Sequence, residues 1–216
     1  MLQSKNYITF LTQSGMHKDL LIESFRRYVA VSDEEAMLIL SLTDERQFKK
    51  GQFISAEGEV NRYTNLIKKG SARVYYIDTS GQEHVIQLGI SGWWTGDFPS
   101  FITQKKGLLY AEALEPTTVT CISYSNLQIL YEKVPVLERA FRLLIQNAYA
   151  SFQYRVLQSL SLDAEERYIA FRNAYPEMDE QISQKHIASY LGMSAEFLSK
   201  IKKRILQKAR KKRTGL

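Results

Sequence analysis

The sequence predicts an α+β protein in which a jelly-roll β domain is followed by a long helix and a small helical domain. Three features carry this prediction. Residues from Phe48 to about Ser125 form short β-rich runs separated by glycines, residues 136–160 contain neither glycine nor proline, and residues 182–205 place apolar side chains at the spacing of two crossed helices. At 216 residues, the chain has the length of one large domain or two modest ones.

The region before the β segment is predicted to be helical over residues 6–29 and 33–42. Ser32 precedes a run of acidic residues, which favours a helix start there. Within the β segment, residues 78–81 (Asp-Thr-Ser-Gly) predict a hairpin turn. The glycines that punctuate the segment are Gly51, Gly58, Gly70, Gly81, Gly89, Gly92 and Gly96. Short strands between such turn signals are typical of a jelly roll.

Residues 135–158 predict a long amphipathic helix. Pro135 suits its first turn, where a missing N–H costs little. The predicted dimer interface consists of Leu137, Phe141, Leu144, Ala148, Phe152 and Val156. This face is too broad to remain in water, so it packs on the chain's own β domain, on a second subunit, or on both. We favour the last, a homodimer built on this helix. A further helix is expected from Glu165 to about Ala174.

Residues 182–205, ISQKHIASYLGMSAEFLSKIKKRI, fit a helix-turn-helix position by position. The shared apolar core is predicted to be Ile187, Leu191, Met193, Leu198 and Ile201. Ala188 leaves room for the second helix to approach, and Gly192 accepts the left-handed backbone of the turn. Ser183 and Ser194 stand where the two helices should begin, as N-caps. A plain helical hairpin shares the apolar spacing, but it does not require alanine and glycine at these places.

Positive charge is concentrated at the C-terminal end. Nine of the 29 basic residues lie between Lys200 and Arg213, and none of the 23 acidic residues follows Glu196. A solvated basic tail is one interpretation. We favour double-stranded DNA as the partner, because a polyanion explains both the charge and the helix-turn-helix pattern.

Several classes of protein are disfavoured by the sequence. The single cysteine, Cys121, forms no internal disulfide or metal cluster and indicates a cytoplasmic protein. We see no signal peptide and no run of the roughly 20 apolar residues that span a membrane. Only one histidine, His84, lies in the β segment, so a cupin-like metalloenzyme lacks its ligands. No catalytic arrangement stands out, and no metal or cofactor is expected.

The order of these parts resembles the Crp/Fnr family of bacterial transcription regulators. The resemblance covers nearly the whole chain, with local matches at GSARVYYIDTSGQEHVIQL, WTGDFPSF and SQKHIASYLGMSAEFLSKI. It implies N-terminal helices and a cyclic nucleotide-binding-like β-roll (a double-stranded β-helix) as a sensor domain over residues 1–133. A dimerisation helix over 134–160 and a DNA-binding domain with a basic tail over 161–216 would follow. Two recognition helices would enter successive major grooves.

The chain departs from the family's cyclic AMP site. In members that bind this ligand, the ligand cassette, which residues 94–101 (WTGDFPSF) match here, contains Gly-Glu. A later Arg-Ser in those members holds the phosphate. Gly96 and Asp97 resemble the first pair, but an ungapped alignment puts Gly107 and Leu108 at the second. Without an arginine fork, bidentate capture of the phosphate is lost, so we expect no cyclic AMP binding. Candidate residues for another effector's pocket are Trp94, Gly96, Asp97, Phe98 and Tyr110; core packing explains the aromatic ones equally well.

Two further departures concern the sensor type and the DNA-binding end. The iron–sulfur members need several cysteines, and this chain has one, so that sensor is excluded. The family's β-hairpin wing is expected to be lacking, because only a basic tail follows Ile205.

Candidate DNA-binding residues follow from the resemblance and the charge. The places matching Ala195, Glu196 and Lys200 touch base edges in the family, where Glu196 would accept from cytosine and Lys200 would donate to guanine. Glu196 also suits a helix start as a dipole partner alone. The full set is Gln184, Lys185, Ser194, Ala195, Glu196, Ser199, Lys200, Lys202, Lys203 and Lys208, of which the later lysines are expected at phosphates.

The sequence therefore predicts a homodimeric, sequence-specific DNA-binding regulator and not an enzyme. RNA polymerase and an unidentified small-molecule effector are candidate partners, and no membrane partner is expected. A different class stays open: a small-molecule receptor or protein-interaction module with a degenerate DNA-binding end.

Overall fold

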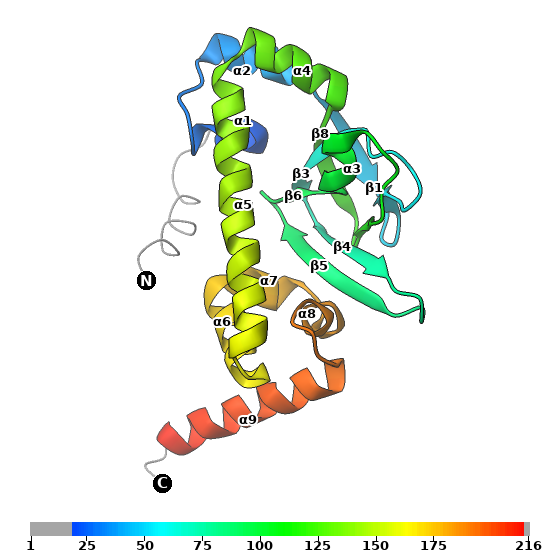
Figure 1. The fold of residues 1–216 in the computed structure, drawn as a ribbon. Coiled ribbons are helices and arrows are strands. Elements are labelled where there is room, and N and C mark those ends of the chain that lie inside the picture. The colour runs from blue at the N-terminus through cyan, green and yellow to red at the C-terminus, as the bar shows by residue number, and fades with distance from the viewer. Residues whose placement is uncertain (1–18, 214–216) are drawn as a thin grey trace.

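The computed structural model describes residues 19–213, with side chains described as far as Lys208. Residues 6–18 of the helix predicted over 6–29 lie outside the described residues. In the described part of that range, helix α1 spans Leu20–Arg26. Helix α2 (Asp33–Ser41) begins at Ser32 as predicted, in a capping box with Glu35. These short helices lie beside the β domain (Figure 1).

Within residues 19–213, eight strands form two four-stranded antiparallel sheets, which confirms the predicted jelly-roll class. The strands are β1 (Asp44–Phe48), β2 (Phe53–Ser55), β3 (Tyr63–Lys69), β4 (Ser71–Ile77), β5 (Glu83–Ile90), β6 (Trp94–Thr95), β7 (Tyr110–Ala113) and β8 (Thr117–Ser123). One sheet has the order β1-β8-β3-β6 and the other β2-β7-β4-β5. Ile67 and Val119 of the first sheet meet Val74 and Ala111 of the second in a buried core. Strand β5 is therefore an edge strand of the second sheet.

Two turns of the roll depend on glycine. Gly70, between β3 and β4, has φ +93°, and a Cβ there would lie 2.7 Å from the carbonyl oxygen of Pro116. The predicted hairpin turn joins β4 to β5, with Gly81 at φ +84°. Asp78 closes it, since its side chain accepts from the backbone N–H groups of Ser80 and Gln82. Hydrogen bonds from Ser80 and His84 hold the pKa of this carboxyl well below its usual range.

Helix α3 (Phe98–Thr103) lies between β6 and β7, and helix α4 (Tyr124–Lys133) follows β8. The long helix α5 (Val136–Ser161) begins directly after Pro135, which stands at its N-cap, one residue before the predicted first turn. The first turns of α5 pack with α1, α2 and α4 around a common core. Two of the six residues predicted for the dimer interface, Leu137 and Phe141, lie in that core and are buried within their own chain. Leu144 is half-buried, whereas Ala148, Phe152 and Val156 are exposed.

Four further helices follow in the described part of the chain: α6 (Ala164–Ala174), α7 (Pro176–Gln181), α8 (Gln184–Tyr190) and α9 (Ala195–Arg213). Helix α9 runs without a break to Arg213, so no β-hairpin wing follows it within the described residues. Helix α8 lies against the β4–β5 edge of the roll, with α9 beyond it (Figure 1). Tyr75 and Val85 of the roll share a hydrophobic cluster with Ile187 and Leu198, so packing crosses the predicted boundary at residue 161.

Candidate nucleic-acid interface

Helices α8 and α9 form the predicted helix-turn-helix. Gly192 has φ +69°, the left-handed conformation that the turn requires. Ile187 and Leu198 are fully buried between the helices, and Ala188 has about the same burial, as the spacing predicted. Ser194 accepts from the backbone N–H of Phe197 at 3.1 Å and so caps α9. Ser183 stands at the N-cap of α8, but its side chain makes no capping hydrogen bond.

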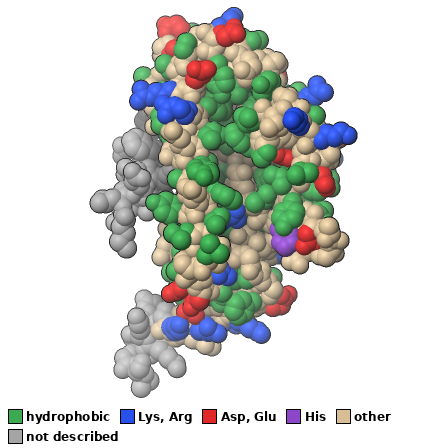
Figure 2. Space-filling model, in the orientation of Figure 1, with side chains coloured by type: hydrophobic (Ala, Val, Ile, Leu, Met, Phe, Trp, Pro, Cys, Tyr) green, Lys and Arg blue, Asp and Glu red, His purple; other side chains and the backbone are tan. Residues whose placement is uncertain are grey.

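The structure places most of the predicted base-reading residues at the exposed start of α9. Ser194, Glu196 and Lys200 are exposed, whereas Ala195 and Ser199 are half-buried. Hydrogen bonds from its own backbone N–H and from the Ser194 hydroxyl lower the pKa of Glu196, and the charge of Lys200 adds to this. Glu196 is thus an ionised acceptor one turn from a cation. Figure 2 shows Lys and Arg side chains gathered over α9.

The predicted phosphate-contacting lysines fall into two groups. Lys185 and Lys203 are exposed, as is the neighbouring Gln184. Lys202 is half-buried and donates to Asp179 of α7 at 2.9 Å. Its ammonium also lies 5.1 Å from the ring centroid of Tyr168. This lysine therefore joins α9 to α6 and α7 within the chain.

Glu165 of α6 neutralises part of the basic face. It pairs with Arg204 at 3.3 Å and with Lys208 at 2.5 Å. Both cations are largely exposed, and surface pairs of this kind contribute about 0–1 kcal/mol. A phosphate group can therefore replace Glu165 as their partner at little cost.

In the cassette region, the carboxylate of Asp97 is fully engaged within the chain. Asp97 is 2% exposed and begins α3 by accepting from the backbone N–H of Ser100 at 3.0 Å. Its second oxygen accepts from the N–H groups of Leu108 and Leu109, each at 3.1 Å. The backbone N–H groups of Ser100, Leu108 and Leu109 are therefore already engaged within the chain.

Gly107 lies directly against that carboxylate. A Cβ at Gly107 would lie only 2.2 Å from the Asp97 oxygen, so no side chain fits here without displacing it. This is the position that the alignment matches to the family's phosphate-binding arginine. An arginine side chain at this position would therefore have to displace the Asp97 carboxylate.

The aromatic residues predicted for an effector pocket are separated in the structure. Trp94 packs on Phe25 and Phe141, whereas Tyr110 stacks on Tyr75 across the second sheet. Phe98 lines a hollow of about 280 Å³ with residues of α3, α4 and α5. The residues lining this hollow are Phe98, Phe101, Ile102, Leu127, Tyr131, Glu138, Phe141, Arg142 and Ile145. Trp94, Gly96, Asp97 and Tyr110 are not among them.

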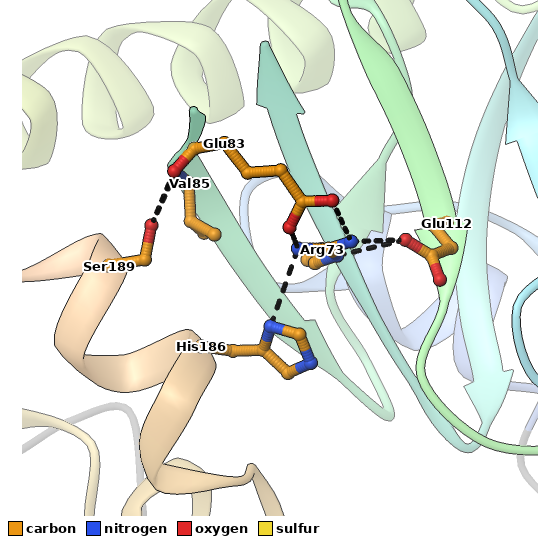
Figure 3. A network of polar contacts seen from close by, with 6 residues as sticks. All are labelled: Arg73, Glu83, Val85, Glu112, His186 and Ser189. Carbon is orange, nitrogen blue, oxygen red and sulfur yellow. Dashed lines mark hydrogen bonds and ion pairs between the residues drawn. The ribbon is translucent and has the colours of Figure 1, made fainter. Parts of the chain in front are cut away.

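Sequence reasoning missed a polar centre between the roll and the helix-turn-helix. Arg73 of β4 lies between Glu83 and Glu112, and it also contacts His186 of α8 (Figure 3). One signal was present: Arg73 interrupts the otherwise apolar stretch ARVYYI. Its partners come from other strands and from a helix more than 100 residues away, so spacing alone does not identify them.

Comparison with known proteins supports this organisation. A cyclic nucleotide-binding domain model matches residues 45–134. Regulatory protein HlyX of Actinobacillus pleuropneumoniae is 27% identical over 168 residues, which cover 73% of this chain and 69% of that protein. The fumarate and nitrate reduction regulatory protein of Vibrio cholerae is 28% identical over 168 residues, covering 73% and 66%. The chain thus spans about two thirds of the length of these relatives.

Solved structures with the same fold include the c-di-GMP responsive global regulator CLP of Xanthomonas campestris. Its TM-score is 0.67 at 16% identity, over 82% of this chain and 93% of that one. Together with the geometry above, these similarities define a class: a cyclic nucleotide-binding domain joined by a long helix to a helical C-terminal region. Within that class, the chain is similar to the Crp/Fnr family of transcriptional regulators, both in its sequence and in the order of its parts.

The described residues contain neither a cluster of metal-binding side chains nor a membrane-spanning helix. No group of three or more His, Cys, Asp or Glu side chains there is arranged to hold a metal ion. None of the helices in that part of the chain is both long and apolar enough to cross a membrane.

Proposed function

We propose that this protein is a homodimeric regulator that binds specific double-stranded DNA through α8 and α9 and does not use cyclic AMP as its effector. The observation that carries the proposal is the exposed start of α9. There Glu196 and Lys200 are exposed, on a helix whose exposed side carries further cations. Side chains at these places of a recognition helix reach base edges when the helix enters the major groove.

The reading chemistry follows from the side chains. An ionised Glu196 accepts a hydrogen bond from the exocyclic amine of cytosine, and Lys200 donates to the acceptors of guanine. Lys203, Lys185 and Gln184 are exposed on either side and suit backbone phosphates, which fix the position of the helix. Lys208 pairs with Glu165 in the free protein and would bind a backbone phosphate in place of this carboxylate. We assign Lys202 an internal role instead.

The second half of α5 supports the homodimer. Beyond Leu144, this helix leaves large apolar side chains in contact with solvent: Tyr149, Phe152, Tyr154, Val156, Leu157 and Leu160. Leu160 is 81% exposed in the single chain. A stripe of this size on a single helix marks an interaction surface. We therefore place the interface on Ala148, Phe152 and Val156 and their neighbours, further along the helix than Leu137 and Phe141.

A mobility-shift assay with the chromosomal region upstream of the protein's own gene tests the proposal. We expect a shifted complex with two protomers per site, weakened by the Lys200→Ala substitution. An unrelated DNA of the same length and base composition serves as the control. Equal affinity for both DNAs would contradict sequence-specific binding.

A second candidate function is a receptor or protein-interaction module with a degenerate DNA-binding end. The pairing of Lys202 with Asp179, and of Arg204 and Lys208 with Glu165, favours it, because these cations are then partly neutralised. The two candidates differ in salt dependence. A DNA-binding protein loses affinity steeply as salt rises, since cations on the protein displace condensed counterions from phosphates.

A further inference from the structure

One edge of strand β5 pairs with no other strand of the described residues, and helix α8 covers that edge. Ser189 of α8 accepts from the backbone N–H of Val85 at 3.1 Å and donates to the carbonyl oxygen of Glu83 at 3.3 Å. The unpaired groups of an edge strand normally face water or another strand. Here one hydroxyl satisfies two of them (Figure 3).

Beside this contact lies a nearly buried arginine. Arg73 donates to Glu83 at 2.5 and 3.2 Å and to Glu112 at 2.9 and 2.6 Å. Its guanidinium also lies 3.9 Å from the ring centroid of Tyr75. Two carboxylates and a ring fix its position, so the group it presents to α8 is rigid.

His186 completes the contact from the side of α8. The Nη1 atom of Arg73 lies 3.5 Å from Nδ1 of His186, so a neutral imidazole with its proton on the other nitrogen accepts from the guanidinium. Burial lowers the pKa of His186, and the charges of Arg73 and Lys185 lower it further. The acidic groups that face it are Glu83 and Glu112.

Apolar packing surrounds these polar contacts. Val85, Leu88 and Ile90 of β5 share a buried cluster with Ile187 of α8. The helix-turn-helix cannot leave the sheet without exposing this surface to water. Tyr75, which belongs to the same cluster, also stacks on Tyr110 of β7, with the ring centroids 5.3 Å apart.

We propose that Arg73, Glu83, Val85, His186 and Ser189 form a docking site that holds the helix-turn-helix on the roll in one orientation. In this orientation α8 is sandwiched between β5 and α9, and the predicted reading side chains of α9 are exposed (Figure 1). Arg73, His186 and Ser189 are then positioning residues for DNA reading, although they touch no DNA. The consequence for DNA rests on the proposed function, whereas the docking itself does not.

The backbone amide of Val85 reports the docking directly. We would measure its hydrogen exchange by NMR in the full chain for the wild type and for Ser189→Ala. Ser183→Ala is the matched control, since this serine stands at the N-cap of the same helix, at the opposite end from Ser189, and its side chain makes no capping bond. We expect Val85 to exchange about two- to tenfold faster in Ser189→Ala, the factor for one lost hydrogen bond of ordinary strength. Ser183→Ala should match the wild type.

A second pair of variants tests the arginine contact. His186→Ala removes the acceptor, whereas His186→Asn keeps one near the position of Nδ1. We expect faster exchange at Val85 in the first variant and recovery toward the wild-type rate in the second. The amide of Ile67, in the other sheet, provides an internal reference for global unfolding. If Val85 exchanges at the same rate in the wild type, in Ser189→Ala and in His186→Ala, the docking site is overturned.

DNA affinity gives the functional measurement. With docking loosened, Ser189→Ala and His186→Ala should bind an operator about two- to tenfold more weakly, with an unchanged salt slope, because no phosphate contact is lost. Faster exchange at Val85 with unchanged affinity would overturn the positioning role. If the wild type binds no DNA while exchange responds as expected, the proposed function fails and the docking site stands.

Discussion

The carboxylate of Asp97 provides the sharpest test of how the cassette region works. Asp97→Ala would leave the N–H groups of Ser100, Leu108 and Leu109 without their acceptor. The site is nearly closed to water, since Asp97 is 2% exposed. Each orphaned donor costs about 1–3 kcal/mol, so we expect the free energy of unfolding to fall by about 3 kcal/mol or more. That is a large part of the roughly 5–15 kcal/mol by which domains are stable.

Urea unfolding followed by circular dichroism measures this loss. Asp33→Ala is the control, because Asp33 is exposed and pairs with Arg26 at the surface, where such pairs are worth about 0–1 kcal/mol. A loss for Asp97→Ala no larger than that of the control would refute the reasoning. It would mean that the backbone N–H groups of Ser100, Leu108 and Leu109 do not depend on this carboxylate.

The remaining predictions concern the ligand, the dimer and the DNA. Calorimetry with cyclic AMP should show no binding near the micromolar range, about −8 kcal/mol, and a clear isotherm there would contradict the absence of a phosphate fork. Phe152→Glu should give monomers in sedimentation, because it places like charges on the proposed interface; an unchanged species would show that the interface lies elsewhere. Glu196→Ala should keep the salt slope and relax preference at one base pair per half-site by about 1–3 kcal/mol, measured on a randomised operator library. Removing residues 208–216, with five basic side chains, should instead lower the slope by roughly 0.9 per lost phosphate contact and weaken all sequences alike.

The sequence by itself determined the elements whose signals are local. Gly192 and Ala188 predicted the turn and the close approach of α8 and α9, because each position has a steric requirement that few residues meet. The glycine-punctuated run predicted the roll, and Ser32 and Pro135 marked the starts of α2 and α5. The charge asymmetry likewise needed no coordinates.

Only the tertiary structure decided which partner covers each face. Periodicity placed Leu137, Phe141 and Phe152 on one stripe of α5, but the helices packed at its first turns bury only the first two. Lys202 and Lys203 are adjacent and chemically identical in the sequence, yet Asp179 lies within reach of Lys202 only. Arg73 and His186 are 113 residues apart and meet because α8 docks on the edge of β5. Helical and strand periods fix the direction of a side chain within its own element, whereas its neighbours depend on how distant elements pack.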